Sequence, residues 1–568
     1  TGTGDGAALI GMNSAFSSTT NSNLIGMSNY ITNACTGSGP KYGIYSIIDP
    51  SAGGAHYGLF SQATKASGYA GYFLGRVSVG FTAGNSYILP LTRGTNGQIM
   101  QTDGSGNVTW QNPSTVIGNN YWSTIGNSGT NASTNFIGTT DNVDLVFKRN
   151  ALVSGKIGTN ATSFGLSALS NAATTLSNSA FGSNALSANT FGNFNAAFGS
   201  SSLASNTTGN GNTAIGEFAL HSNTTGEDNT ATGYYSLQAN TTGNNNTANG
   251  DYALLRNVTG NDNTAIGKST LFSNISGGNN TAVGRSSLFS NTIGSQNTAT
   301  GYYSLSANTT GMYNTANGYY TLSSNTIGSY NTANGNESLF ANTTGNYNVA
   351  NGSYSLHANT TGTQNTAIGF SSLSSNTIGS FNTANGYFSL GYNTTGNNNT
   401  AMGIYSLLLN TSGAFNVANG GEALYSNSIG NNNVGIGYSA LRLNTTGDNN
   451  AANGTLALYS NNNTANGYTA LRFNTTGSNN SSLGSSALYS NTTGNNNVAI
   501  GYGALHENNI GNSNIAIGIQ AGYNETGSNK LYIENSNSAT PLIYGEFDTD
   551  LARINGNFRV NSTTVAGE

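Results

Sequence analysis

The side chains that could catalyse a reaction or hold a metal ion are few and far apart in this sequence. The four histidines are His56, His221, His357 and His506, and no His-x-x-x-His pair or acidic cluster accompanies them. A metal site needs several such ligands around one ion. The single cysteine, Cys35, excludes an intrachain disulfide framework and a thiolate zinc cluster. We therefore expect no metal, no cofactor and no catalytic residues.

The acidic residues likewise indicate no metal site and no catalytic site. Asp228, Asp262 and Asp448 occupy turn positions that hold Asn elsewhere, and they form no column, which disfavours a calcium-binding solenoid. An enzyme such as a glycan depolymerase would need paired carboxylates in one groove. With acids this sparse, we expect no enzyme, although carboxylates from neighbouring chains could still converge.

Aromatic side chains are the best candidates for binding. They occur in pairs directly after a recurring glycine: Tyr234, Tyr235, Tyr302, Tyr303, Tyr319, Tyr320, Tyr387 and Phe388. Aromatic faces beside amides suit sugars, so these pairs indicate a strip that contacts glycans or another surface. Stacked aromatics also stabilise neighbouring strands, and other repeats place Lys268-Ser269 or Arg285-Ser286 at the same positions. Of the two interpretations, we favour stabilisation.

Composition excludes several classes of function. Of 568 residues only 6% are charged, against about 25% in typical domains. With 15 Lys and Arg and a net charge of -5, we expect no nucleic-acid partner, because each phosphate contact needs a nearby cation. No apolar run is long enough for a membrane-spanning helix, so we expect no membrane insertion. The many hydroxyls and amides suit an extracellular surface.

A seventeen-residue repeat dominates the chain. A glycine recurs at this step from Gly165 to Gly454, a spacing of 13 leads to Gly467, and the regular step then resumes to Gly518, which makes 22 units. A leucine lies four residues after the glycine in 21 of them. Alanine usually lies two residues before the glycine and asparagine seven after it. The expected structural core includes Gly216, Gly233, Gly250, Leu220, Leu237, Leu254, Leu271, Leu288 and Leu305.

This repeat predicts an all-β fold, a parallel β-solenoid or β-roll in which each unit is one coil. A helical-hairpin repeat needs about 33 residues or more. Asn-Thr-Ala-x-Gly predicts a short strand with Ala on one face and Thr and the variable residue on the other. Asn-Thr-Thr-Gly is typical of a turn. The Ser-Leu segment is a second short strand or a single helical turn, and we favour the strand. Asn side chains can form ladders along the stack, which would be about 100 Å long.

The expected core is thin. One Leu and one Ala per coil provide little apolar burial, since a buried Leu contributes about 2 kcal/mol and each ordered residue costs about 1.5 kcal/mol. Neighbouring chains are the natural source of further burial. We therefore expect an intertwined or laterally packed homo-oligomer, with a trimer favoured.

Four segments follow from the pattern. Residues 1–90 carry a looser repeat of about 15, as in Leu9-Ile10-Gly11-Met12 and Leu24-Ile25-Gly26-Met27. Residues 91–160 form a connector with short β segments around a turn at Asp103-Gly104-Ser105-Gly106-Asn107. Residues 161–525 form the rod, and residues 526–568 form a β cap or junction that includes Leu531-Tyr532-Ile533.

The repeat resembles the head of trimeric autotransporter adhesins, whose Asn-Ser-Val-Ala-Ile-Gly units stack as left-handed parallel β-rolls in a trimer. Asn212-Thr213-Ala214-Ile215-Gly216 and Asn497-Val498-Ala499-Ile500-Gly501 are among the closest matches. The repeat in this chain is longer than the head unit of that family, and no heptad stalk or membrane anchor is evident. The flanks, including Gly527-Ser528-Asn529-Lys530-Leu531-Tyr532-Ile533, resemble phage-type tail fibres and bacterial surface fibres. Both resemblances imply a trimeric surface fibre.

We therefore expect a structural fibre or adhesin on a cell or virion surface, which attaches through multivalent contacts. The alternative in the same class is a subunit that joins end to end into an extracellular filament. A Thr column such as Thr213, Thr230 and Thr247 could bind ice, but it is broken at Val349 and Val417. The 13-residue unit around Asn461-Asn462-Asn463 predicts a local irregularity in the rod.

Overall fold

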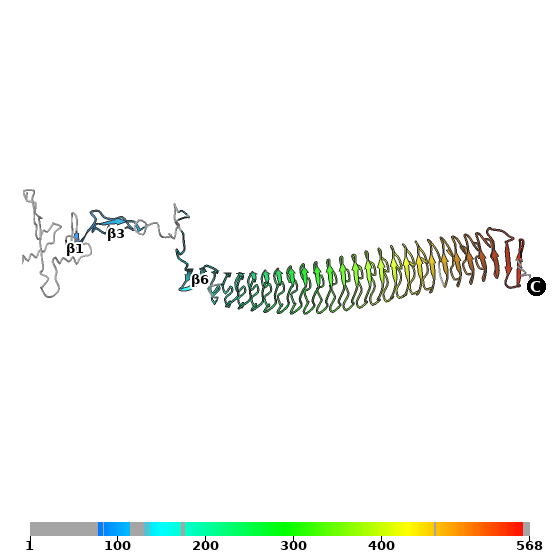
Figure 1. Cartoon of the computed structure of the whole chain (residues 1–568), viewed down its shortest axis with the longest axis horizontal. Helices are drawn as coiled ribbons and strands as arrows, with labels where there is room; N and C mark the ends of the chain where they lie inside the picture. Colours follow the sequence, from blue (N-terminus) through cyan, green and yellow to red (C-terminus); the bar gives the residue numbers. More distant parts are fainter. Residues whose placement is uncertain are drawn as a thin grey trace, which may run out of the picture. The chain divides into compact units, whose positions relative to one another are not determined.

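The computed structural model describes residues 78–82, 85–113, 131, 133, 136–171, 176–458 and 462–559. The chain divides into two compact units, Thr1–Ile137 and Gly138–Glu568 (Figure 1). Cys35, His56 and the repeated segments predicted before residue 78 lie outside the described residues.

The described part of the first unit contains two antiparallel hairpins. Strand β1 (Ser78–Thr82) pairs with β2 (Asn85–Ile88), and β3 (Ile99–Thr102) pairs with β4 (Val108–Gln111). The predicted turn at residues 103–107 joins β3 to β4, and the Asp103 carboxylate accepts hydrogen bonds from Ser105 and Asn107. These bonds, the one from the Asn107 side chain first, lower the pKa of Asp103.

The second unit is a stack of short strands. Its bounds are β5 (Leu145–Arg149), β6 (Leu152–Ile157), β7 (Thr162–Phe164), β8 (Ser179–Phe181), β9 (Ala196–Phe198), β10 (Thr213–Ile215), β11 (Thr230–Thr232), β12 (Thr247–Asn249), β13 (Thr264–Ile266), β14 (Thr281–Val283), β15 (Thr298–Thr300), β16 (Thr315–Asn317), β17 (Thr332–Asn334), β18 (Val349–Asn351), β19 (Thr366–Ile368), β20 (Thr383–Asn385), β21 (Thr400–Met402), β22 (Val417–Asn419), β23 (Val434–Ile436), β24 (Ala451–Asn453), β25 (Thr464–Asn466), β26 (Ser481–Leu483), β27 (Val498–Ile500), β28 (Ile515–Ile517), β29 (Lys530–Ile533), β30 (Ile543–Glu546) and β31 (Leu551–Ile554).

One continuous sheet runs through this unit. Strands β7 to β29 pair in parallel, each with the next coil and with equivalent residues opposite one another, as Ala214 is opposite Ala231. The ends differ: β5 and β6 add antiparallel strands before β7, and β30 and β31 add them after β29. Among the described strands no pairing joins β31 to β5, so the sheet is an open stack along the rod and not a closed barrel. The predicted all-β parallel solenoid of 17-residue coils is confirmed.

The predicted second strand is wrong. Each full coil contains one three-residue strand, and the Ser-Leu segment is a run of turns. The core leucines adopt left-handed backbone angles, for example φ 51° at Leu220 and 52° at Leu305. Such angles are uncommon for leucine, but here the backbone bonds to the adjacent coils and the side chain is buried: the Leu220 amide donates to the Ser236 carbonyl over 3.0 Å.

The recurring glycine forms a corner that no other residue fits. At Gly318 φ is 138°, and an added Cβ would lie 2.6 Å from the Gly335 carbonyl oxygen of the next coil. The backbone of each coil therefore approaches that of its neighbour directly at this corner.

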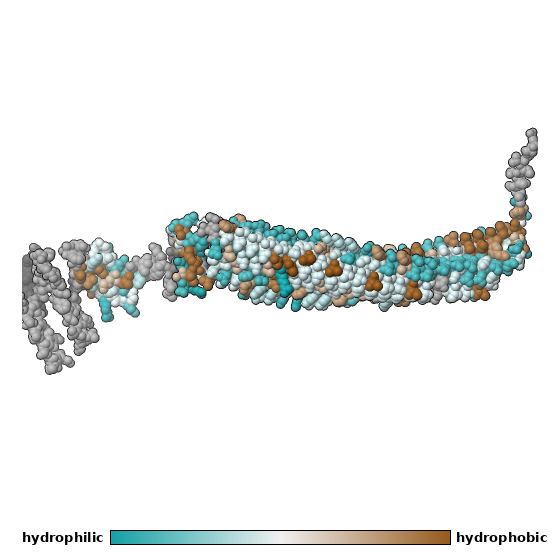
Figure 2. Space-filling view, turned by 90° about the horizontal axis from the view of Figure 1, so that it is seen from below, coloured by the Kyte–Doolittle hydropathy of each residue, from teal (hydrophilic) through white to brown (hydrophobic). Residues whose placement is uncertain are grey.

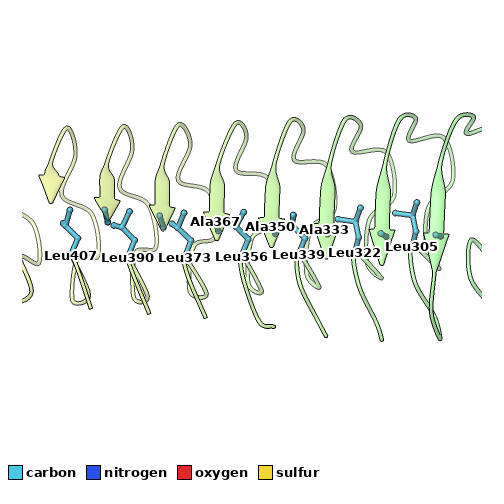
Figure 3. Packing of buried hydrophobic residues seen from close by; sticks show 14 of the residues in the cluster. Leu305, Leu322, Ala333, Leu339, Ala350, Leu356, Ala367, Leu373, Leu390 and Leu407 are labelled. Carbon is cyan, nitrogen blue, oxygen red and sulfur yellow. The ribbon is translucent and has the colours of Figure 1, made fainter. Parts of the chain in front are cut away.

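The interior is closed within one chain. The Leu and Ala columns point towards each other from opposite sides of the coil (Figure 3), and members such as Leu322, Leu356 and Ala350 have no exposed surface. This cluster runs from Ala168 to Ala521.

Two buried ladders of asparagine amides complete the interior. In one, Asn240 Nδ2 donates to Asn223 Oδ1 over 2.8 Å and to the Gly243 carbonyl over 3.0 Å, and the pattern repeats along the rod. In the other, the Asn246 backbone amide donates to Asn229 Oδ1 over 3.0 Å. Buried amides are tolerated because their hydrogen bonds are satisfied, so the ladders act as polar cross-links between coils.

The 13-residue unit causes the predicted irregularity. Strand β24 still pairs with β25 in register, with Ala452 opposite Ala465, so the missing residues come from the turns. The Asn444 side chain, which precedes the short coil, keeps its donor bonds, but its Oδ1 has no partner among the described residues. The amide ladder is therefore interrupted at this coil.

Candidate functional site

The paired aromatic residues lie on the turn side of the coils. Tyr302 and Tyr319 stack with ring centroids 5.5 Å apart and an angle of 9°, and Tyr303 and Tyr320 stack at 5.3 Å and 13°. Within one coil, Tyr302 and Tyr303 are tilted by 57° at 4.6 Å. The stacked rings cover one another's faces, which leaves mainly edges and hydroxyls to solvent.

The two rings of each other predicted pair also contact each other within one coil. Tyr234 and Tyr235 meet edge to face at 4.3 Å, and Tyr387 and Phe388 do so at 4.8 Å. The first member of each pair is exposed and the second is half-buried. These contacts agree with the favoured interpretation that the pairs stabilise the stack, while the exposed rings leave a surface that a ligand can touch.

The close packing perturbs the phenols. The pKa of Tyr234 is raised, first by its hydrogen bond with Tyr235. Burial, followed by neighbouring phenols, raises the pKa of Tyr320 and of Tyr405. These hydroxyls therefore stay protonated and can donate hydrogen bonds at any ordinary pH.

Further aromatic columns were missed by the sequence analysis, and two of them illustrate the pattern. In one, Tyr330 stacks on Tyr313 at 4.7 Å and on Tyr347 at 4.9 Å, and all three rings are exposed. In the other, His506 stacks between Tyr489 and Tyr523 at 4.9 and 4.5 Å. The members of each column are one repeat length apart in the sequence, so the repeat spacing could have predicted these columns.

The structure does not bring the histidines together. His221 bonds to the Ser201 carbonyl, His357 to Glu337 and His506 to Glu507. Each lies in a different coil. Among the described residues, no group of three His, Cys, Asp or Glu side chains could hold a metal ion.

The acids at turn positions have a backbone role. Asp228 and Asp262 have φ of 54° and 57°, and Asn245 and Asn279 have the same conformation at the equivalent positions. Asp and Asn are the side chains that best tolerate this region. Tyr313 and Tyr330 have the same conformation at equivalent positions, so this backbone accepts Asp and Asn without requiring them.

A cleft of about 230 Å³ lies beside the short coil. Arg442, Leu443, Arg472 and Phe473 contribute to its lining. Arg442 is paired with Glu422 at 2.7 Å and lies over the Tyr425 ring.

Apolar side chains are unevenly distributed over the outside of the rod. On the side shown in Figure 2 they are scattered along the middle coils and gather over the last coils. In the part of the chain that the structure describes, no helix is long and apolar enough to cross a membrane.

No family of known proteins, no curated protein and no solved structure matches this chain. The resemblances to autotransporter heads and tail fibres therefore rest on the quoted motifs and on the solenoid fold, which is compatible with a structural fibre.

Proposed function

We propose that this protein is a structural component of an extracellular fibre, in which the solenoid is a stiff spacer on a cell or virion surface. The observation that carries the proposal is the unbroken sheet from β5 to β31. Most full coils add backbone bonds, an apolar Leu and Ala, and amide cross-links to the same stack. Bending such a rod breaks several bonds per coil, so it holds its two ends a fixed distance apart.

Attachment through many weak contacts is the finer part of the proposal. A rod about 100 Å long that presents exposed side chains at equivalent positions in successive coils gains avidity from repetition, without any single strong site. The exposed tyrosines such as Tyr319 and Tyr347 are the groups we expect to touch glycans on a target surface.

End-to-end assembly is a second candidate. Among the described residues, β5 and β31 each pair on one side only. Exposed strand edges template pairing with another chain. This observation favours a filament in which the C-terminal end of one rod meets the N-terminal end of the next.

Electron microscopy of the purified protein tests the central proposal. We expect straight rods of uniform width and about 100 Å length; flexible or globular particles would contradict it. Continuous filaments would favour end-to-end assembly. A glycan array, run beside an assay for released reducing sugar, tests attachment: binding without release supports the adhesin, and release would indicate a depolymerase.

A further inference from the structure

The outward side of the stacked strands differs from the rest of the rod. We define the strand face as the first and third residues of each strand from β7 to β28, because the middle residue points inward and is buried. Figure 1 shows these strands side by side along the rod. None of them contains Asp, Glu, Lys, Arg or His.

All charges of the coils lie on the turns instead. Between β7 and β28 these residues are Glu217, Glu227, Asp228, Asp251, Arg256, Asp262, Lys268, Arg285, Glu337, Glu422, Arg442, Asp448, Arg472 and Glu507. The absence of charge suits burial of this face against a partner, because an unpaired charge is costly to desolvate.

The side chains of the strand face are also suited to burial. Most are Thr, Val, Ile or Asn, which are short or stiff and lose little rotamer freedom when a partner covers them. Asn317 Nδ2 already donates to Asn334 Oδ1 over 2.9 Å, so part of the polar surface is satisfied within the chain. In one chain the face is open: Ile266 is 41% and Leu483 50% exposed.

The two ends of the strand face are apolar and the middle is polar. Phe164, Phe181 and Phe198 form a stack at one end, with centroid distances of 5.5 and 5.0 Å. Strands β27 and β28 carry only Val and Ile on the face at the other end. Thr and Asn predominate between them, as in β16 and β17.

We infer that a second copy of this chain packs on the strand face, sheet against sheet. Both faces repeat at the strand spacing of about 4.8 Å, so their side chains can interdigitate along the whole rod. A face about 10 Å wide and 100 Å long buries about 1,000 Å² on each copy, which reaches the size of a stable protein interface. In an antiparallel pair, the Phe end of each copy packs on the Val and Ile end of the other copy. The polar middle parts of the two copies then face each other. The inference deepens the proposed fibre by naming its partner, and so rests on that function.

An ice surface is the competing occupant of a flat Thr-rich face. The third strand position varies between Asn, Thr, Ile, Met and Phe in neighbouring coils, so the face has no uniform height. A protein partner accommodates such variation by side-chain packing, whereas a crystal plane does not. The observations therefore favour a second copy.

The test places charge on the strand face and compares it with charge on a turn. The triple variant Thr247→Lys, Thr298→Lys and Thr383→Lys changes exposed strand-face positions. The control variant, Thr225→Lys, Thr361→Lys and Thr395→Lys, makes the same change at exposed turn positions. In sedimentation velocity we expect the unmodified chain and the control to sediment as oligomers. We expect the strand-face variant to sediment as a monomer of 58.0 kDa, with an unchanged circular dichroism spectrum.

An unmodified chain that stays monomeric at tens of micromolar would overturn the inference, as would equal behaviour of the two variants. Ice binding is measured as thermal hysteresis, the gap between the melting and freezing temperatures. If the unmodified protein and the turn control show this gap and the strand-face variant does not, the face binds ice instead. Electron microscopy distinguishes failure of this inference from failure of the proposed fibre. Single rods of one-chain width would refute the pairing of two copies but leave the proposed rod intact. Absence of rods would refute both the pairing and the proposed fibre.

Discussion

The full coils and the short coil between Gly454 and Gly467 make an informative comparison. Both have a three-residue strand in register, a glycine corner and an inward leucine, as in β24, Gly454 and Leu458. The short coil lacks four turn residues, and the side-chain oxygen of Asn444, in the full coil before it, has no partner among the described residues; the same holds for Asn491, in a full coil further along. Strand, corner and leucine therefore define a coil, while the Asn-Thr-Thr-Gly turn adds cross-links that the stack can lack locally.

The corner is shared by both kinds of coil, so breaking it has the largest expected effect. Gly318→Ala and Gly454→Ala each force alanine into φ near 140° and place its Cβ 2.6 or 2.3 Å from a backbone oxygen of the next coil. We expect each to lower the free energy of unfolding by about 4 kcal/mol or more, measured by denaturation followed by circular dichroism. Gly421→Ala is the control, because its Cβ meets only side-chain atoms at 3.3 Å or more. Equal loss in the control would contradict the account.

The leucine column is the next largest contributor. Leu322→Ala empties a fully buried site and should cost about 2–5 kcal/mol. Ile327→Ala, at a residue that is 53% exposed, should cost less than about 0.5 kcal/mol. Native-state hydrogen exchange of the flanking coils measures both, and a small effect of Leu322→Ala would mean that the coil is held without its core.

The asparagine ladder differs between the regular stack and the full coil that precedes the short one. Asn359 donates to Asn342 and to the Gly362 carbonyl and accepts from Asn376, whereas Asn444 makes only the two donor bonds. Asn359→Ala should therefore cost about 1 kcal/mol more than Asn444→Ala. The same exchange measurement gives both values, and a larger loss for Asn444→Ala would reverse the comparison.

Deleting residues 343–346 from a full coil should create a second short coil. The deletion removes several hydrogen bonds between coils, among them the Thr343 side-chain bond to the Thr360 carbonyl and the Asn331 bond to the Gly345 carbonyl, each worth about 1 kcal/mol. The strand and leucine remain, so we expect an unchanged β spectrum and a modest fall in melting temperature. Loss of the folded rod would show that the short coil depends on its own sequence.

The smallest effect concerns the antiparallel end of the stack. Hydrogen bonds from Tyr544 and then Lys530 and Thr549 lower the pKa of Glu546 below its ordinary value. A lowered pKa means that ionised Glu546 stabilises the folded end above the unfolded pKa, and that this contribution is lost as pH falls through the folded pKa. Faster amide exchange in β30 and β31 below about pH 4, absent in Glu546→Gln, checks it.

The period, the direction of stacking and the inward columns could all be predicted from the amino-acid sequence. Equivalent residues such as Leu220 and Leu237 must occupy equivalent places when one coil repeats, and only one side of a coil can be buried. The same periodicity located the aromatic pairs, including Tyr302 and Tyr319, which stack on each other. It also located the irregularity at the short coil, because four residues cannot be removed from a regular stack without a local change.

Only the tertiary structure decided the backbone between the strands. The Ser-Leu segment was predicted to be a second strand, yet Leu220 adopts a left-handed φ of 51°, an angle that is uncommon for leucine. Its amide bonds and its burial depend on the adjacent coils, a full repeat away along the chain, which local propensity does not register. For the same reason, the charge-free strand face becomes visible only when the strands lie side by side, since burial against a partner is a property of a surface and not of any one repeat.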